Sequence, residues 1–290
     1  ALPISQPLLD ARTQARQAIR QMLPTELWEQ NEAFTKALCA QVQGHRFCTH
    51  PLIEAMSTRD IRLDWLKPFY SDTVHAISGR FTDYLVQAML NCAALQPLLG
   101  VEAASASRFL LQINALDELG FVPGDLDGHF CGTPENGHLN QLFKVMADIG
   151  ISEVEQAAYV ASPASESVAQ LIEQYRHDHL YLATLLAVME SSLNPWTECW
   201  ARGTAIATGM DTSQGYHAIH TADHDGHLID DDHSEDSWYI VRQALTLADH
   251  AAIGQLAVEL LARLERYADY QFGLLEAQAQ KARRTDALPA

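Results

Sequence analysis

Apolar side chains recur at intervals of three and four residues along most of this chain, the spacing that places them on one face of an α-helix. In residues 70–97, for example, Val74, Ile77, Phe81 and Leu85 follow this spacing. We find no convincing segment that alternates strictly between apolar and polar residues, as a half-buried strand would. Helix breakers are also few, because the 290 residues include only 15 glycines and 11 prolines. We therefore expect an all-α fold.

Turn-forming residues divide the chain into about eight to ten helical segments. The predicted breaks fall at Pro68, Gly100, Ser162-Pro163, Asn194-Pro195 and Thr212 to Gly215. A longer insertion, 120–137 (GFVPGDLDGHFCGTPENG), is predicted to lack regular structure, and loops of this length are often functional. We find no internal repeat or linker. Residues 1–290 are therefore predicted to form a single all-helical domain, with peripheral ends at 1–20 and 281–290.

The chain carries 19 basic and 37 acidic residues, a net charge of −18. This charge repels nucleic-acid phosphates and anionic lipids, so we expect no nucleic-acid and no membrane partner. No stretch approaches the roughly 20 apolar residues that span a bilayer, and the first residues do not resemble a signal peptide. The five cysteines are scattered, which argues against disulfides. We expect a soluble, cytoplasmic protein, with a homodimer as one option for its oligomeric state.

Acidic residues stand at two costly places in the predicted helices. Asp117 and Glu118 close an apolar helix that stops at Gly120, where acids oppose the helix dipole at roughly 0.3–1 kcal/mol each. Glu190 follows the apolar run LYLATLLAVM and shares a helix face with Leu186. A buried carboxylate is costly unless it is paired or bound to metal. The alternatives are a solvated helix end for the first pair and a solvent-reaching edge position for Glu190.

His138 opens another predicted helix, HLNQLFKVMADIG. Glu135 precedes it by three residues, the Glu-x-x-His spacing of di-iron helical bundles. Pro134 and Gly137 argue against a regular helical turn between the two. His138 is thus a candidate metal ligand, with helix capping as the simpler alternative, and Glu135 is a fallback ligand if Glu118 is structural.

Five of the 13 histidines crowd into one stretch, GYHAIHTADHDGHLIDDDH. On a helix, His220, His224 and His227 would share one face, whereas Asp230 and His233 form an i, i+3 pair. Imidazoles and carboxylates without thiolates favour iron, manganese or zinc. The alternative is an exposed, acidic and His-rich surface that binds metal adventitiously.

Together these features resemble the haem-oxygenase-like di-iron oxidases, all-helical proteins that bind two non-haem irons. The likeness covers residues 70–275 and rests on Asn114-x-x-Asp117-Glu118-x-Gly120, His138 at a helix start, Glu190 in an apolar helix and Tyr216-x-x-x-His220. It implies a haem-oxygenase-like helical bundle without haem, in which Glu118 and Glu190 are catalytic and Glu190 is shared by the irons. The implied metal ligands are Glu118, His138, Glu190, His220, His227, Asp230 and His233.

The last helix departs from the family's pattern, which is His, then Asp four residues later, then His three further. Counting from His220 places His224 where Asp is expected and His227 last. The other register uses Asp230 and His233, with His227 standing in for the first histidine. Both registers remain open.

The resemblance implies two irons, with O2 as co-substrate. The expected substrate is a small amine or amino-acid-derived metabolite, which would undergo N-oxygenation or oxidative C–C cleavage. Arg108, Arg176 or Arg242 could pair a substrate carboxylate, although helix-surface arginines are ordinarily solvated. The insertion 120–137 is longer than in relatives and would shape the substrate entrance.

Three alternatives remain open. One is a fatty-acid-type oxidative decarboxylase of the same fold. Another is a thiamin-hydrolase-like enzyme, which would need a nucleophile such as Cys92 or Cys199. The last is a non-enzymatic, His/Asp-rich metal-binding helical protein, in which Glu118 and Glu190 would be dispensable for metal binding.

Overall fold

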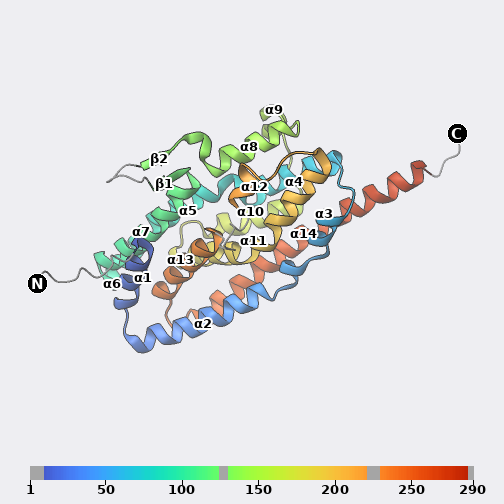
Figure 1. Ribbon diagram of the computed structural model, residues 1–290. Coiled ribbons are helices and arrows are strands. Elements are labelled where there is room, and N and C mark those ends of the chain that lie inside the picture. Colours follow the sequence, from blue (N-terminus) through green and yellow to red (C-terminus); the bar gives the residue numbers. More distant parts are fainter. Residues whose placement is uncertain (1–9, 124–129, 221–228, 287–290) are drawn as a thin grey trace, which may run out of the picture.

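The computed structural model describes residues 10–123, 130–220 and 229–286, and it confirms an all-α helical bundle (Figure 1). The longer helices are α1 (Ala11–Gln21), α2 (Thr25–Gln43), α3 (Pro51–Thr58), α4 (Leu63–Ala76), α5 (Phe81–Asn91), α7 (Val101–Glu118), α8 (His138–Asp148), α10 (Pro163–Tyr175), α11 (His179–Thr208), α13 (Ile229–Ala244) and α14 (His250–Asp286). The short ones are α6 (Gln96–Leu99), α9 (Glu153–Ala157), α12 (Tyr216–Ile219) and the 3-10 turns η1 (Arg46–Thr49), η2 (Ser78–Arg80), η3 (Cys92–Leu95) and η4 (Pro134–Asn136).

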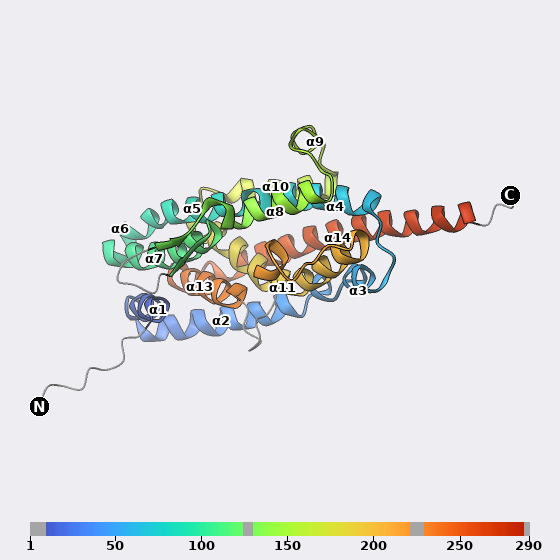
Figure 2. The same ribbon diagram turned by 45° about the horizontal axis from the view of Figure 1, so that its top comes forward.

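Helix α11 lies at the centre of the bundle. It packs against α13, α3, α14 and α2, so that helices distant in the sequence surround it (Figures 1 and 2). Its apolar run is buried on every side, with Leu182, Leu185, Leu186 and Val188 all fully inaccessible to solvent. This explains why the run shows no polar stripe: a helix that is apolar all round belongs in the interior.

Local capping and backbone conformation explain two of the predicted breaks. Ser162 accepts a hydrogen bond from the backbone of Ser165, and Pro163 occupies the first turn of α10, where its missing N–H is harmless. Gly100 adopts φ +90° between α6 and α7, a conformation that favours glycine. The predicted breaks at Gly100, Ser162-Pro163 and 212–215 are therefore confirmed.

Two predicted breaks are wrong, because Pro68 lies inside α4 and Pro195 lies inside α11. Each proline removes one backbone hydrogen bond from its helix. Buried side chains on either side, such as Phe69 in α4 and Trp196 in α11, anchor the chain in the core despite that loss. Tertiary packing has overridden local preference at both positions.

The insertion 120–137 is not structureless, as we had expected. Strands β1 (Phe121–Pro123) and β2 (Phe130–Gly132) form an antiparallel hairpin, which is followed by η4. The hairpin lies over α7 and precedes α8 (Figure 1). The described parts of this connection therefore form a small folded element beside the bundle.

The two ends of the described chain differ. We expected residues 1–20 to be peripheral, but α1 packs against α7 and α13 and buries Ala15 and Ile19. At the other end, the last turns of α14 extend beyond the bundle (Figures 1 and 2). None of the described helices is both long and apolar enough to cross a bilayer.

Candidate metal centre

The end of α7 and the start of α8 meet at a glycine. Gly120 adopts φ +84°, and a Cβ atom there would lie 2.5 Å from the backbone nitrogen of Gly137. Only glycine allows this approach, which brings Asp117 and Glu118 beside His138. The predicted helix stop before Gly120 and the predicted helix start at His138 are both confirmed.

Two carboxylates of α7 face the two ring nitrogens of His138. Glu118 Oε1 lies 3.2 Å from His138 Nδ1, and Asp117 Oδ2 lies 4.0 Å from His138 Nε2. Glu118 and His138 are buried, whereas 26% of the Asp117 side chain is exposed. The acids at this helix end are thus directed at an imidazole rather than fully solvated.

His233 of α13 stands between Asp117 and the central helix. Its Nε2 lies 3.3 Å from Asp117 Oδ2, and its Nδ1 lies 3.9 Å from Glu190 Oε1 on α11. His233 is only 1% exposed, and Glu190 is buried rather than at a solvent-reaching edge. In order, Glu118, His138, Asp117, His233 and Glu190 form what we call the acid–histidine chain.

The acid–histidine chain holds more acids than bases. It contains three carboxylates and two imidazoles from four helices, and within the described part of the protein its ion-pair partners are histidines rather than arginines or lysines. Burial is the largest influence on Asp117 and raises its pKa, but His233, His138 and Arg12 together hold that pKa below its usual value. Asp117 is therefore ionised at neutral pH.

Three buried polar atoms of the acid–histidine chain have no well-oriented hydrogen bond among the described residues. His233 Nε2 and Asp117 Oδ2 lie 3.3 Å apart, but neither of these buried atoms, nor His233 Nδ1, makes a well-oriented hydrogen bond to a described residue. Buried polar atoms in this state are rare and call for an explanation. A cation that accepts both oxygen and imidazole ligands would satisfy them.

The donors form a line rather than a closed shell. Over residues 10–123, 130–220 and 229–286, no three His, Cys, Asp or Glu side chains converge closely enough to enclose one ion. The chemistry of the donor set fits a first-row transition metal, because it combines carboxylates with imidazoles. Side-chain rotations would be needed to close a coordination sphere.

His220 joins the site from the end of α12. Its ring centre lies 5.1 Å from that of His138, and the planes are nearly perpendicular at 82°. The structure thus brings one histidine from each predicted register, His220 and His233, to the same region. His224 and His227 lie outside the described residues, as does the side chain of Asp230, whose backbone belongs to α13.

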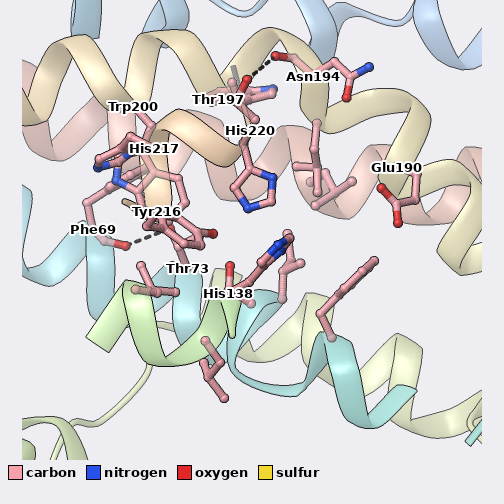
Figure 3. A pocket seen from close by; sticks show the side chains of 18 of the residues that line it. Phe69, Thr73, His138, Glu190, Asn194, Thr197, Trp200, Tyr216, His217 and His220 are labelled. Atoms are coloured by element: carbon pink, nitrogen blue, oxygen red, sulfur yellow. Dashed lines mark hydrogen bonds between the residues drawn. The ribbon is translucent and has the colours of Figure 1, made fainter. Parts of the chain in front are cut away.

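A cavity of about 130 Å³ adjoins the acid–histidine chain. Figure 3 shows His138 and His220 between aromatic side chains on one side and Glu190 on the other. The lining residues that could bind metal form what we call the donor end of the cavity: Glu118, His138, Glu190 and His220. The lining residues with rings on the opposite side form what we call the aromatic end: Phe69, Trp200, Tyr216 and His217.

A surface groove runs beside the donor end. It is lined by the α5 residue Asp83, by parts of the 120–137 segment including Phe121 and Thr133, and by Glu118 and Leu139. Glu118 and Leu139 also line the cavity, so the groove and the cavity share a wall. The hairpin therefore lies where we expected a substrate entrance.

Asp236 forms a second buried polar cluster that we did not predict. It lies one turn after His233 and pairs with Arg12 and with Arg16, whose Nε is 2.7 Å from Asp236 Oδ1. Arg12 also donates a hydrogen bond of 2.7 Å to Asn114 Oδ1, one turn before Asp117. Nothing local in the sequence links α1 to these residues, and the spacing from His233 to Asp236 was the only available signal.

The arginines proposed for a substrate carboxylate do not line the cavity. Arg108 donates to the carbonyl of Met89, and Arg176 pairs with Glu173. Arg242 is buried and engages Thr35 and Glu235. All three arginines therefore make their polar contacts with other residues of the protein.

Other candidate residues also lie apart from the site. Cys92 and Cys199 are buried away from the cavity lining, and burial raises the pKa of each thiol to about 12, which disfavours a nucleophilic thiolate. Glu135, the fallback ligand, is exposed. Asp117, which we noted as a costly acid at the end of its helix but did not include among the implied ligands, occupies the middle of the acid–histidine chain.

A scan against protein families and a search of curated proteins both found no match to this chain. A fold class alone does not specify a function. Function must therefore be inferred from the side chains of the site and from the cavity beside them.

Proposed function

We propose that this protein is a non-haem, two-iron oxidase or oxygenase that uses O2 to oxidise a small amine or amino-acid-derived metabolite. The observation that supports this proposal is the acid–histidine chain beside a largely apolar cavity. Four-helix dinuclear sites are built from such carboxylates and histidines projecting inward from separate helices. The proposed reaction is N-oxygenation or oxidative C–C cleavage.

The described residues that would hold metal are those of the acid–histidine chain together with His220. His227 and Asp230 complete the proposed ligand set from the sequence. When bound, iron supplies the O2-activating redox chemistry that no side chain provides. The carboxylates would supply negative charge for the cations, and the imidazoles would supply nitrogen ligands.

The protein's own contribution is position and access. Glu118 and Glu190 line the cavity, so a bound substrate lies next to the proposed metal ligands. The apolar walls limit the water that reaches this place. Since the described residues that line the cavity include no arginine or lysine, an amine fits it better than a free carboxylate would.

Anaerobic Fe(II) titration of the full chain, followed by metal analysis and Mössbauer spectroscopy, tests the proposal. We expect two irons per chain, with spectra of magnetically coupled iron after exposure to O2. His233→Ala and Asp117→Asn should weaken iron binding by more than about 100-fold, beyond the loss typical of residues outside the coordination sphere. Glu135→Gln is the matched control, because it removes an exposed acid in the same region and should change nothing.

Two outcomes would contradict the proposal. Failure to bind iron stoichiometrically would exclude a two-iron enzyme. Undiminished iron uptake in the double variant Glu118→Gln/Glu190→Gln would instead favour the non-enzymatic metal-binding alternative, which depends on the histidine cluster alone.

A further inference from the structure

The aromatic end of the cavity is built from rings in mutual contact. Phe69 and Trp200 meet edge to face with centroids 5.8 Å apart, and Trp200 and Tyr216 do the same at 5.5 Å. Tyr216 in turn lies 4.9 Å from the ring of His220. This series of rings leads from the core directly to the donor end (Figure 3).

The hydrogen bonds behind these rings determine the state of His217. Thr204 donates to the carbonyl of Trp200, so its oxygen accepts from the Tyr70 hydroxyl at 2.7 Å. The Tyr70 oxygen must then accept from His217 Nε2, 2.8 Å away. His217 therefore carries its proton on Nε2 and keeps a lone pair on Nδ1.

His217 is also uncharged. Burial, with a smaller contribution from His220, lowers the pKa of His217 to about 4. The aromatic end thus offers flat rings and an uncharged imidazole. It offers no cation, because the described residues that line the cavity include neither arginine nor lysine.

The size of the cavity limits what the rings can hold. Its volume of about 130 Å³ is close to the roughly 150 Å³ of apolar cavities that accommodate benzene. Aromatic rings attract other rings edge to face and attract cations over their faces. A carboxylate would meet no cationic partner there and would face Glu118 and Glu190 instead.

We propose that the aromatic end binds the single ring of an arylalkylamine, a molecule with N–H donors and no acidic group. This deepens the proposed function, because it rests on that function for the reaction and names the substrate class. The binding step itself depends on the rings and not on iron. The two proposals can therefore fail separately.

Isothermal titration calorimetry of the full chain, before and after chelator treatment, tests this assignment. The probes are 2-phenylethylamine, phenylacetate with the same ring but opposite charge, and hexylamine with the same ammonium group but no ring. We expect 2-phenylethylamine to bind at least about tenfold more tightly than either comparator in both preparations, an energy of 1.4 kcal/mol or more. Equal or tighter binding of phenylacetate, equal binding of hexylamine, or no binding of 2-phenylethylamine would overturn the assignment.

Variants locate the binding to the cavity. Trp200→Leu should weaken 2-phenylethylamine binding at least about tenfold, whereas Trp200→Phe, which keeps a ring, should retain most of it. Phe109→Leu is the control, because Phe109 is an exposed aromatic residue of α7 outside the cavity. Tyr216→Leu provides a second test if Trp200→Leu does not fold. Unchanged affinity in Trp200→Leu or Tyr216→Leu would overturn the assignment.

Amine binding and iron binding give independent readouts. If 2-phenylethylamine binds and iron does not, the substrate class stands and the two-iron reaction fails. If iron binds and the amine does not, the reaction stands and the substrate class is wrong.

Discussion

Two buried polar clusters meet on α13 one helical turn apart, one at Asp236 and the other at His233. The acids of the two clusters have different partners. Asp236 is fully buried and pairs with two arginines of α1. The acid–histidine chain, which reaches α13 at His233, faces imidazoles instead. Arginine keeps its proton at any ordinary pH, so Asp236 is permanently paired. The acid–histidine chain instead sets three carboxylates against two imidazoles, so its acids outnumber its bases.

The arginine side of this comparison is visible in the pKa of Arg16. Burial alone would lower it, but the carboxylates of Asp236 and Asp232 outweigh burial and raise it. For Asp236, by contrast, burial is the largest influence and raises the pKa, which the charges of Arg12 and Arg16 offset only in part. The pair joins α1 to α13 one turn from His233, so we assign Asp236 a structural role.

The largest expected effect comes from breaking the arginine pair. Asp236→Ala leaves Arg12 and Arg16 without their buried partner and should lower the free energy of unfolding by about 3–5 kcal/mol. Urea unfolding measures this change. Asp232→Asn is the control, because Asp232 pairs with the same Arg16 at a partly exposed position and should cost less than about 1 kcal/mol. Similar losses in the two variants would refute the contrast.

The next effect should come from adding iron to the acid–histidine chain. Fe(II) at about 100 times its dissociation constant should raise the free energy of unfolding by about 2.7 kcal/mol. Thermal melts under anaerobic conditions measure this gain, which Asp117→Asn should abolish at the same iron concentration. A stabilisation that survives in Asp117→Asn would place the bound iron elsewhere.

At a third buried titratable group, His179, burial outweighs the opposing charge of Asp178. Burial lowers the pKa of His179 to about 4, and among the described residues neither ring nitrogen has a hydrogen-bond partner. Between the ordinary value of 6.5 and this value the unfolded chain binds more protons, so stability falls as pH falls. From pH 7 to pH 5 the expected loss is about 2 kcal/mol.

Unfolding curves at the two pH values compare wild type with His179→Leu, which should lose this part of the pH dependence. His177→Leu is the matched control, since His177 is exposed two residues earlier. A pH dependence that is the same in all three proteins would show that His179 titrates normally in the folded state.

The smallest effect should come from neutralising one acid of the site. Glu190→Gln keeps the shape of the side chain, and Glu190 faces His233 at 3.9 Å rather than an arginine. We expect the free energy of unfolding of the metal-free protein to change by less than about 1 kcal/mol. Urea unfolding of Glu190→Gln beside Asp236→Ala measures the contrast, and a loss above 3 kcal/mol would make Glu190 a structural acid as well.

The sequence predicts much of the fold because helices depend on local spacing and capping. The apolar periodicity, Gly100 and Ser162 indicated real helices and real ends. The helix breaks predicted at Pro68 and Pro195 were wrong, because burial of the residues around each proline outweighs one lost hydrogen bond. The hairpin in 120–137 was missed because each strand has only three residues, too few for an alternating pattern.

The candidate site was likewise only partly predictable from the sequence. Residue chemistry alone drew attention to Glu118, His138, Glu190 and the histidine cluster, since acids on apolar faces and crowded imidazoles are unusual in any helix. It did not reveal that Asp117 lies between His138 and His233. That relation requires α7, α8 and α13 to converge.

Helical periodicity is a property of neighbours in the chain, so an all-α protein and most of its helix ends follow from the residues in order. The contacts of His233 with Asp117, of Arg12 with Asp236 and of Trp200 with Tyr216 join separate segments. Which faces of those helices meet depends on how the whole core packs, because each helix buries its apolar side against several others. Tertiary packing therefore determines which acids meet arginines and which meet histidines beside a cavity.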